Sequence, residues 1–266
     1  MRIGFIGTGN MGTAIIKGYL KKNPEVSGNL AAFDADTEKA AQLSRETGIR
    51  ICADTVELAG CSDIIVLAVK PNTYEAVLGF LSGHFTPDKT VISMAAGIST
   101  GYIERFFDHP VKVVRIMPNT PALVNEGMTA LCRNKLVSDE EFHQIAELFD
   151  SIGKTEAVSE TLMDAVTGVS GSSPAYVYMF IEALAEAGIA QGLPERQSYK
   201  FAAQSVLGAA KMVLETGIHP NELRDMVCSP GGTTIEAVKA LQGNGFREDI
   251  FEAVQAAVDK SRRMTK

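Results

Sequence analysis

Three glycines, Gly7, Gly9 and Gly12, follow a short apolar segment at the start of the chain and precede a helical pattern. In this setting the first glycine permits a tight turn, the second lets a pyrophosphate approach the backbone, and the third permits close helix–strand packing. The phosphates then lie at the N-terminus of the helix, where free N–H groups attract negative charge. We therefore predict a nicotinamide dinucleotide site formed by Gly7, Thr8, Gly9, Asn10, Met11 and Gly12.

An acidic residue lies where the adenosine ribose of such a cofactor is expected. Asp34 ends the second apolar segment, roughly 20 residues past the glycines. A carboxylate at this position binds ribose hydroxyls and repels a 2′-phosphate, so its charge favours NADH over NADPH. The alternative is that Asp34 or Asp36 caps the helix that follows. The sequence predicts a cofactor that is either NADPH or NADH.

Three further loops follow apolar strands and are expected to meet at the carboxyl edge of one sheet, where open α/β sheets bind ligands. Lys70 faces the cofactor or an anionic substrate in one interpretation and is an ordinary exposed lysine in the other. Asn119 lies between two prolines and is either a ligand group or a turn-forming residue. The cofactor-binding residues predicted from these loops are Ala68, Val69, Lys70, Pro71, Ala96, Gly97 and Asn119.

A polar loop in the second half, Ser229-Pro230-Gly231-Gly232-Thr233-Thr234, leads into a helix. Backbone N–H groups at a helix N-terminus, joined by three hydroxyls, form a site suited to a carboxylate. The alternative is that Thr233 or Thr234 is a simple helix cap. Residues 170–176 form a second loop of this kind. The substrate-binding residues predicted from the first loop are Ser229, Gly231, Gly232, Thr233 and Thr234.

The pattern of the first half predicts the elements that hold these loops. Apolar segments alternate with amphipathic ones, which is typical of a doubly wound α/β domain with a parallel, Rossmann-like sheet. Buried strands are expected at 3–7, 30–34, 64–68, 90–94 and 111–117, and shorter ones near 128–132 and 154–158. Helices are expected at 12–22, 37–47, 73–81, 99–107 and 138–151. This dinucleotide-binding domain is predicted to span residues 1–160.

The remaining residues, 161–266, are predicted to form an all-α domain for dimerisation and substrate binding. Helices are expected at 174–191, 194–215, 220–227, 233–242 and 246–263, several of them beginning at proline. Two of these helices are apolar around most of their circumference, which indicates burial on several sides. We expect that burial in a homo-oligomer; the alternative is a self-contained bundle that packs on the sheet.

Composition excludes several classes of function. A net charge of −7, from 25 basic and 32 acidic residues, disfavours a nucleic-acid surface. Four scattered cysteines and four isolated histidines suggest neither a disulfide framework nor a metal site. The N-terminus shows no signal-peptide pattern and no apolar run is long enough to span a membrane, so we expect a cytoplasmic protein that binds a small molecule.

The glycine turn, the segments Ala68–Pro71 and Asn119–Pro121, and above all the loop Ser229–Thr234 closely resemble the Δ1-pyrroline-5-carboxylate reductase family. The resemblance implies the last step of proline biosynthesis, in which NAD(P)H reduces the imine of pyrroline-5-carboxylate to L-proline. It also implies that the helical domain interlocks with that of a second subunit, that the active site lies between one cofactor domain and the neighbour's helices, and that dimers can assemble into decamers.

The same resemblance suggests roles for single residues. Thr234 would hydrogen-bond the imine nitrogen, and Ser229 with the N–H groups of Gly232 through Thr234 would hold the carboxylate. Thr55 stands where the family commonly has an asparagine near the adenosine ribose.

Two other functions fit parts of the pattern. A hydroxyacid dehydrogenase of related fold would use Lys70 and Asn119 as its acid/base pair, but it also needs a catalytic lysine on its helices. The candidates, Lys200 and Lys211, lie in largely apolar helices. A non-catalytic dinucleotide sensor would not need the second anion-binding loop. A protonated imine is already a strong hydride acceptor, so an imine reductase needs less acid/base machinery than either alternative implies.

Overall fold

The computed structural model describes residues 1–264. The chain forms two compact units. One unit contains residues 1–172 and the C-terminal residues from 256 on, and the other contains residues 173–255.

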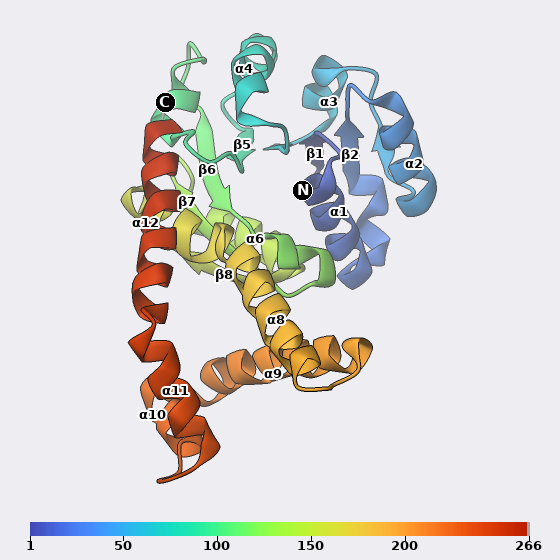
Figure 1. The fold of residues 1–266 in the computed structure, drawn as a ribbon. Helices are drawn as coiled ribbons and strands as arrows, with labels where there is room; N and C mark the ends of the chain where they lie inside the picture. The colour runs from blue at the N-terminus through green and yellow to red at the C-terminus, as the bar shows by residue number, and fades with distance from the viewer. Residues whose placement is uncertain (265–266) are drawn as a thin grey trace. The chain divides into compact units, whose positions relative to one another are not determined.

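The first unit is built on one eight-stranded sheet, with the strand order β3-β2-β1-β4-β5-β6-β7-β8 (Figure 1). The six strands from β3 to β6 run parallel, whereas β7 is antiparallel to β6 and β8 is parallel to β7. The Rossmann-like parallel sheet is confirmed, and the reversal at β7 is an addition that the sequence pattern did not indicate. The strands are β1 (Ile3–Ile6), β2 (Leu30–Phe33), β3 (Arg50–Ile51), β4 (Ile64–Leu67), β5 (Thr90–Ser93), β6 (Lys112–Met117), β7 (Gly127–Arg133) and β8 (Gly153–Ala157).

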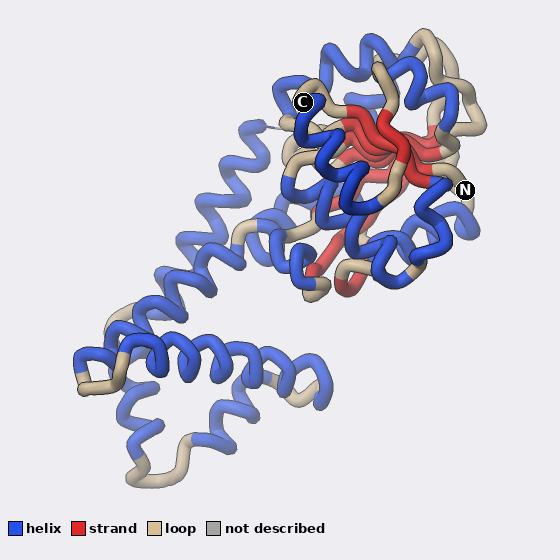
Figure 2. Tube along the Cα trace, turned by 90° about the vertical axis from the view of Figure 1, so that its right-hand side faces the viewer, coloured by secondary structure: helices blue, strands red, loops and turns tan. Residues whose placement is uncertain are grey.

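Helices cover both faces of this sheet, as Figure 2 shows. One face carries α1 (Asn10–Lys22), α2 (Thr37–Thr47) and α6 (Asp139–Asp150), which bury their apolar side chains in one core cluster with β1 and β6. The other face carries α3 (Thr55–Cys61), α4 (Tyr74–Ser82) and α5 (Thr100–Glu104), which form a second cluster. The central strands are buried on both faces, which explains why their sequences are almost continuously apolar.

Short turns of helix connect the larger elements of this unit. Four are 3₁₀ turns and one, η5, is a π-helical turn that directly precedes the second unit. A short α7 (Met163–Val166) leads into η5. The turns are η1 (Pro24–Asn29), η2 (Pro71–Thr73), η3 (Thr120–Val124), η4 (Glu160–Leu162) and η5 (Thr167–Gly171).

Local side chains explain where several helices begin. Asp36 caps α2, Asp54 caps α3 and Ser99 caps α5, each accepting a hydrogen bond from a backbone N–H of the first turn. Ser138 and Glu141 form a reciprocal capping box at the start of α6. The caps of α2, α3 and α5 fix the starts of these helices at the carboxyl edge of the parallel strands, whereas the capping box of α6 lies at the opposite edge because β7 is antiparallel.

The second unit consists of helices. They are α8 (Ser173–Ala190), α9 (Glu195–Thr216), α10 (Pro220–Val227), α11 (Thr233–Gly243) and the first part of α12 (Phe246–Met264). Ala185 and Ser198 are buried where α8 packs on α9, and the Ser198 hydroxyl donates to the Ala185 carbonyl at 2.6 Å. Most other apolar side chains of these two helices are exposed. An all-α second part of the chain is confirmed.

The structure differs from the sequence-based expectation in several elements. Strand β3 and helix α3 lie between residues 48 and 63, for which no element was predicted. Helix α5 ends at Glu104 rather than at Phe107. The π-helical turn η5 was also not predicted. Among residues 1–264, no helix is long and apolar enough to cross a membrane.

Candidate functional site

The glycine turn after β1 requires its glycines for steric reasons. Gly7 has φ +103°, and a Cβ added there would lie 2.5 Å from the Ala68 carbonyl oxygen. A Cβ on Gly12 would lie 2.4 Å from the Gly7 carbonyl oxygen, whereas a Cβ on Gly9 would meet nothing within 4 Å. Gly7 and Gly12 therefore pack against protein, and Gly9 leaves the backbone open to a ligand.

The N-terminus of α1 faces that opening. Gly9 is the N-cap, no side chain caps the helix, and the first helical hydrogen bond runs from the Thr13 N–H to the Gly9 carbonyl at 2.9 Å. Gly9 and Asn10 are exposed. The first N–H groups of a helix have no partner within it, and they lie at its positive end. This arrangement suits a phosphate group.

The carboxylate of Asp34 braces the glycine turn. One of its oxygens accepts from the Thr8 N–H at 2.6 Å and from the Thr8 hydroxyl at 2.9 Å, and the other accepts from the Asp36 N–H at 2.9 Å. The cap of α2 is Asp36, not Asp34, and the hydrogen bond from Lys39 lowers the pKa of the Asp36 carboxyl. A carboxylate has lone pairs beyond the three that Asp34 uses, so it can also accept from a ribose hydroxyl.

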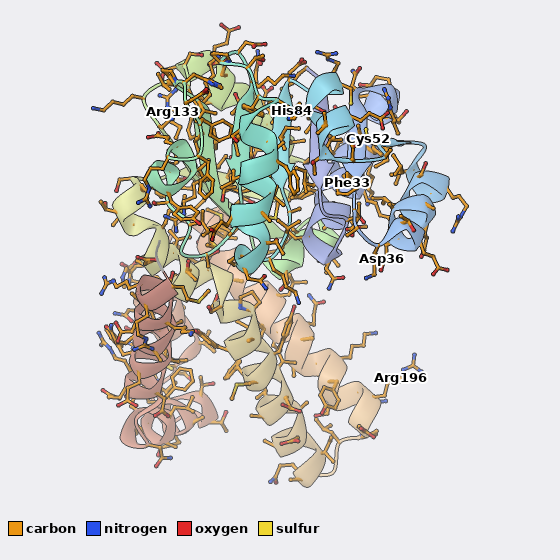
Figure 3. The ribbon with its side chains drawn as sticks, turned by 90° about the horizontal axis from the view of Figure 1, so that it is seen from above. Phe33, Asp36, Cys52, His84, Arg133 and Arg196 are labelled. Atoms are coloured by element: carbon orange, nitrogen blue, oxygen red, sulfur yellow. The ribbon has the colours of Figure 1, made fainter. Side chains whose placement is uncertain are left out.

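Other predicted cofactor residues reach the same edge of the sheet. Strand register aligns Ile6 with Phe33 and with Leu67, and Leu67 with Ser93, so the loops that follow these strands meet. Figure 3 labels Phe33, Asp36 and Cys52 at the β2–β3 end of this edge. Along it lie Asp34 after β2, Thr55 at the start of α3, Ala68, Val69, Lys70 and Pro71 after β4, and Ala96 and Gly97 after β5. Lys70 is exposed.

Asn119, the predicted cofactor residue after β6, uses its side-chain amide within the protein. Its nitrogen donates to the Ser170 carbonyl at 3.2 Å, and its oxygen accepts from the Met128 N–H at 2.9 Å. The side chain thereby links the β6–η3 turn to β7 and to the π-helical turn η5. The same nitrogen lies 3.4 Å from the Ser170 hydroxyl oxygen, so the nitrogen and the oxygen of the amide both have partners within the protein. This geometry supports the structural alternative for Asn119.

The polar loop of the second unit is a tight turn followed by α11. The Gly232 N–H donates to the Ser229 carbonyl at 3.0 Å, and Gly231 has φ +69°. Proline at the second position and a left-handed glycine at the third are typical of a type II turn. Gly232 is the N-cap of α11 without a side-chain cap, so Thr233 and Thr234 are not its caps. The Thr234 side chain is half-buried and Ser229 is exposed.

His219, Lys200 and Lys211 lie on the helices of the second unit. His219 caps α10, because its Nδ1 accepts from the Asn221 N–H at 3.2 Å. Lys200 and Lys211, the lysines that a hydroxyacid dehydrogenase would need, are exposed on α9. Within residues 1–264, no group of three or more His, Cys, Asp or Glu side chains could hold a metal ion.

A buried polar chain next to the β5–α5 loop was not predicted. Arg115, on β6, is 4% exposed, and its Nη1 lies 3.3 Å from Glu160 Oε1. Glu160 also accepts from the Thr100 N–H and hydroxyl, each at 2.7 Å. The sequence indicates this cluster only through Arg115, a charged residue within the apolar strand β6. Its partner Glu160 lies 45 positions further along the chain, so the sequence does not connect the two.

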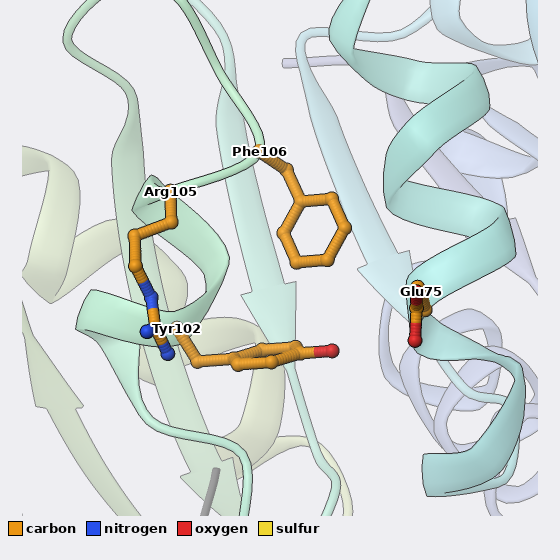
Figure 4. A pocket seen from close by; sticks show the side chains of 4 residues that line it. All are labelled: Glu75, Tyr102, Arg105 and Phe106. Carbon is orange, nitrogen blue, oxygen red and sulfur yellow. The ribbon is translucent and has the colours of Figure 1, made fainter.

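A pocket on the first unit lies away from the predicted site residues. Figure 4 shows this pocket of about 600 Å³ between α4 and α5, where Tyr102 and Phe106 lie across from Glu75 and the Arg105 guanidinium lies 5.3 Å from the centre of the Tyr102 ring. The pocket is open, and few of the polar groups that line it converge on one point. We assign it no role in the chemistry.

Comparison with known proteins identifies the family. Residues 160–264 match the family described as pyrroline-5-carboxylate reductase dimerisation, and residues 2–97 match the family described as NADP oxidoreductase, coenzyme F420-dependent. Pyrroline-5-carboxylate reductase of Escherichia coli K12 is 46% identical over 100% of this chain and 98% of its own, and that of Methanosarcina acetivorans is 41% identical over the same shares.

Solved structures agree with these relatives. A pyrroline-5-carboxylate reductase from Coxiella burnetii superposes with a TM-score of 0.92 at 34% identity, covering 100% of this chain and 98% of its own. Plasmodium falciparum pyrroline carboxylate reductase with NADP bound superposes with a TM-score of 0.90, also at 34% identity and with the same coverage. Because relatives this similar match it from end to end, the chain belongs to the pyrroline-5-carboxylate reductase family.

Proposed function

We propose that this chain reduces Δ1-pyrroline-5-carboxylate to L-proline with NADPH or NADH, the last step of proline biosynthesis. The observation that carries the proposal is the end-to-end match to pyrroline-5-carboxylate reductases, at up to 46% identity. The glycine turn of the first unit and the Ser229–Thr234 loop of the second supply the two kinds of binding site that this reaction needs.

The first unit fits a nicotinamide dinucleotide. Gly7 and Gly12 leave no room for a Cβ, Gly9 leaves the backbone open, and the N-terminus of α1 has no side-chain cap. When bound, the reduced nicotinamide supplies a hydride. In our proposal the turn Gly7–Gly12 holds the pyrophosphate, Asp34 and Thr55 lie beside the adenosine ribose, and the loops after β4, β5 and β6 line the nicotinamide end.

The Ser229–Thr234 loop is the proposed substrate site. The carboxylate of the substrate would accept hydrogen bonds from the Ser229 hydroxyl and from the N–H groups of Gly232 through Thr234, with Gly231 and Thr233 shaping the turn. The positive end of the α11 dipole favours this negative charge. The N–H of the protonated imine would donate to the Thr234 hydroxyl oxygen, which holds the imine in place. Hydride addition to the C=N carbon then leaves that proton on the ring nitrogen of proline.

The charge of Asp34 leads us to propose a preference for NADH. A 2′-phosphate on the ribose would approach a carboxylate that already accepts two hydrogen bonds from Thr8. Repulsion between the two negative groups disfavours NADPH, since like charges within about 4 Å cost on the order of 1 kcal/mol or more even in polar surroundings.

The helical second part of the chain serves dimerisation in this proposal. Residues 160–264 match a dimerisation family, and α8 and α9 expose large apolar side chains that a monomer would leave in water. They are Val177, Tyr178, Met179, Phe180 and Leu184 on α8, and Tyr199, Phe201, Leu207, Met212 and Leu214 on α9. We propose residues 161–266 as the dimerisation and substrate-binding domain, 1–160 as the cofactor domain, a decamer as the further assembly, and the cytoplasm as the compartment.

A spectrophotometric assay tests the proposal. Purified protein is mixed with pyrroline-5-carboxylate and either NADH or NADPH, and oxidation of the cofactor is followed by its absorbance. We expect oxidation that depends on both protein and imine, and faster with NADH at equal subsaturating concentrations. If neither cofactor is oxidised, the proposed reaction is wrong. If NADPH is preferred, only the NADH preference proposed from the charge of Asp34 is wrong.

A further inference from the structure

The loop between β5 and α5, residues 94–99, carries two predicted nicotinamide-side residues, Ala96 and Gly97. The pyrophosphate site lies at the end of β1 and the adenosine site at the end of β2, so the nicotinamide must extend to the opposite side, over β4 and β5. The position of this loop therefore decides where the reacting ring lies. The structure fastens it at three points.

At its first end the loop is held through Ser93, the last residue of β5. The Ser93 hydroxyl donates to the Tyr74 phenol oxygen at 3.1 Å, and the Tyr74 hydroxyl donates to the Leu67 carbonyl at 3.0 Å. Burial raises the pKa of Tyr74 to about 12, so the phenol keeps the proton that it donates. The ends of β4 and β5 are thereby tied together through α4.

The middle of the loop, at Gly97, packs against the C-terminal end of α12. Gly97 has φ +74°, and a Cβ added there would lie 2.7 Å from the carbonyl carbon and oxygen of Met264. The Ser261 hydroxyl fixes this end of α12 by donating to the Asp164 carboxylate on α7 at 2.6 Å. The loop can therefore not move towards α12.

At its second end the loop is held by Glu160. Both of its oxygens bind Thr100, one the backbone N–H and the other the hydroxyl, each at 2.7 Å. Glu160 is in turn oriented by Arg115, at 3.3 Å. Thr100 directly follows Ser99, which is the last residue of the loop and the N-cap of α5. The Glu160 carboxylate therefore fixes the position of this end of the loop.

The placement of Arg115 argues for such a role. Arg115 is buried on β6 between Val113 and Met117, which belong to two different apolar clusters, and its Nε and Nη2 make no hydrogen bond with residues 1–264. A buried cation held by one carboxylate contributes little net stability, and an apolar side chain of similar size is often neutral or better. A buried ion pair can instead specify one arrangement of the elements it joins, and here it joins β6 and η4 to the start of α5.

We infer that Glu160, oriented by Arg115, is a positioning residue that holds the β5–α5 loop against the nicotinamide end of the cofactor. This inference rests on the proposed function for its cofactor, but not for its substrate. Neither residue touches the reacting atoms. Their effect passes through Thr100 and the loop.

Binding measurements on purified protein test the inference without substrate turnover. We would compare the affinity for NADH with that for ADP-ribose, which lacks the nicotinamide, by calorimetry. The variants are Glu160→Gln and Thr100→Val, with Thr100→Ser as the variant that restores the hydroxyl and Glu156→Gln, an exposed glutamate on β8, as the charge-matched control. Thermal unfolding of the same samples reports whether each variant is folded.

We expect Glu160→Gln to weaken NADH binding by about tenfold and Thr100→Val by about fivefold, as for the loss of a hydrogen bond to a charged or neutral group. ADP-ribose affinity stays unchanged, and Thr100→Ser and Glu156→Gln bind NADH like the wild type. Folded variants in which NADH and ADP-ribose weaken equally, or in which neither changes, would overturn the inference. A wild-type chain that binds neither compound would overturn the proposed cofactor as well.

Discussion

At the scale of single residues, Asp34 has two roles that can be separated. Its charge is proposed to disfavour a 2′-phosphate, and its oxygens hold Thr8. Asp34→Asn removes the charge but keeps an oxygen for Thr8, so we expect the ratio of kcat/KM for NADPH to that for NADH to rise by about tenfold. Steady-state kinetics with both cofactors measure this ratio.

A control variant separates the effect of the charge from the effect of the hydrogen bonds to Thr8. Asp34→Ala removes both the charge and these hydrogen bonds, so it should lower kcat/KM with both cofactors because the glycine turn becomes less rigid. If Asp34→Asn leaves the cofactor ratio as in the wild type, then the charge does not set the preference.

Thr234 supports the second residue-scale prediction. If its hydroxyl makes a hydrogen bond with the ring nitrogen as the C=N bond is reduced, Thr234→Ala lowers kcat by about tenfold or more, corresponding to a hydrogen bond of roughly 1.5 kcal/mol. Thr234→Ser keeps the hydroxyl and should retain most of the turnover. Equal kcat values for the alanine variant and the wild type would remove Thr234 from its proposed role.

The residue scale also shows what the sequence could predict. The glycines were assigned steric roles from their spacing alone, and the structure has the corresponding close approaches at Gly7 and Gly12. The brace between Thr8 and Asp34 and the Arg115–Glu160–Thr100 cluster could not be predicted, because each depends on residues 15 or more positions apart that only the sheet topology brings together.

At the scale of elements, an ion pair joins the starts of β1 and β4. The Asp63 carboxylate accepts from the Arg2 N–H at 2.8 Å and from the Arg2 guanidinium at 2.5 Å. The hydrogen bond from Arg2 lowers the pKa of Asp63. A carboxyl whose pKa is lowered by folding stabilises the fold above its unfolded value and loses that contribution as the pH falls through its folded value.

We therefore expect Asp63→Asn to lower the free energy of unfolding at pH 7 by about 1 kcal/mol or less, because both partners are partly exposed to solvent. The difference from the wild type should shrink as the pH falls below about 4, the ordinary pKa of aspartate, and disappear at a pH below the lowered pKa of folded Asp63, where both forms are neutral at this position. Denaturant unfolding at both pH values measures it. A difference that stays constant down to that pH would show that the charge is not its cause.

Elements with a strong pattern were predicted well, and short ones were not. The central strands are continuous apolar runs; α2 and α6 have side-chain caps at their starts, and α9 and α10 begin at or directly after a proline. Strand β3 contains two residues, and α5 contains five, too few for a periodic pattern to be distinct. The π-helical turn contains five residues, also too few for a distinct periodic pattern.

At the scale of the whole molecule, the exposed apolar face of α8 and α9 makes the monomer an unfavourable state. Met179 is 67% exposed and Phe201 is 60% exposed. Charges at both positions, Met179→Glu with Phe201→Glu, should convert the dimer to a monomer, because an unpaired carboxylate cannot be buried in an apolar interface without a large cost.

Phe80→Glu is the matched control, since Phe80 is 66% exposed but lies on α4 of the first unit. It should leave the assembly unchanged. Light scattering coupled to size exclusion gives the mass of each variant. Dissociation by the control, or a double variant that keeps the mass of the wild type, would contradict this interface.

Transfer of a labelled hydride is the most direct test of the central claim. The reduced cofactor carries deuterium in place of both hydrogens at C4 of the nicotinamide, the enzyme turns over pyrroline-5-carboxylate, and the product is analysed by mass spectrometry and NMR. We expect L-proline with one deuterium on C5, the carbon of the former C=N bond. Proline without deuterium, or label in a product other than proline, would contradict it.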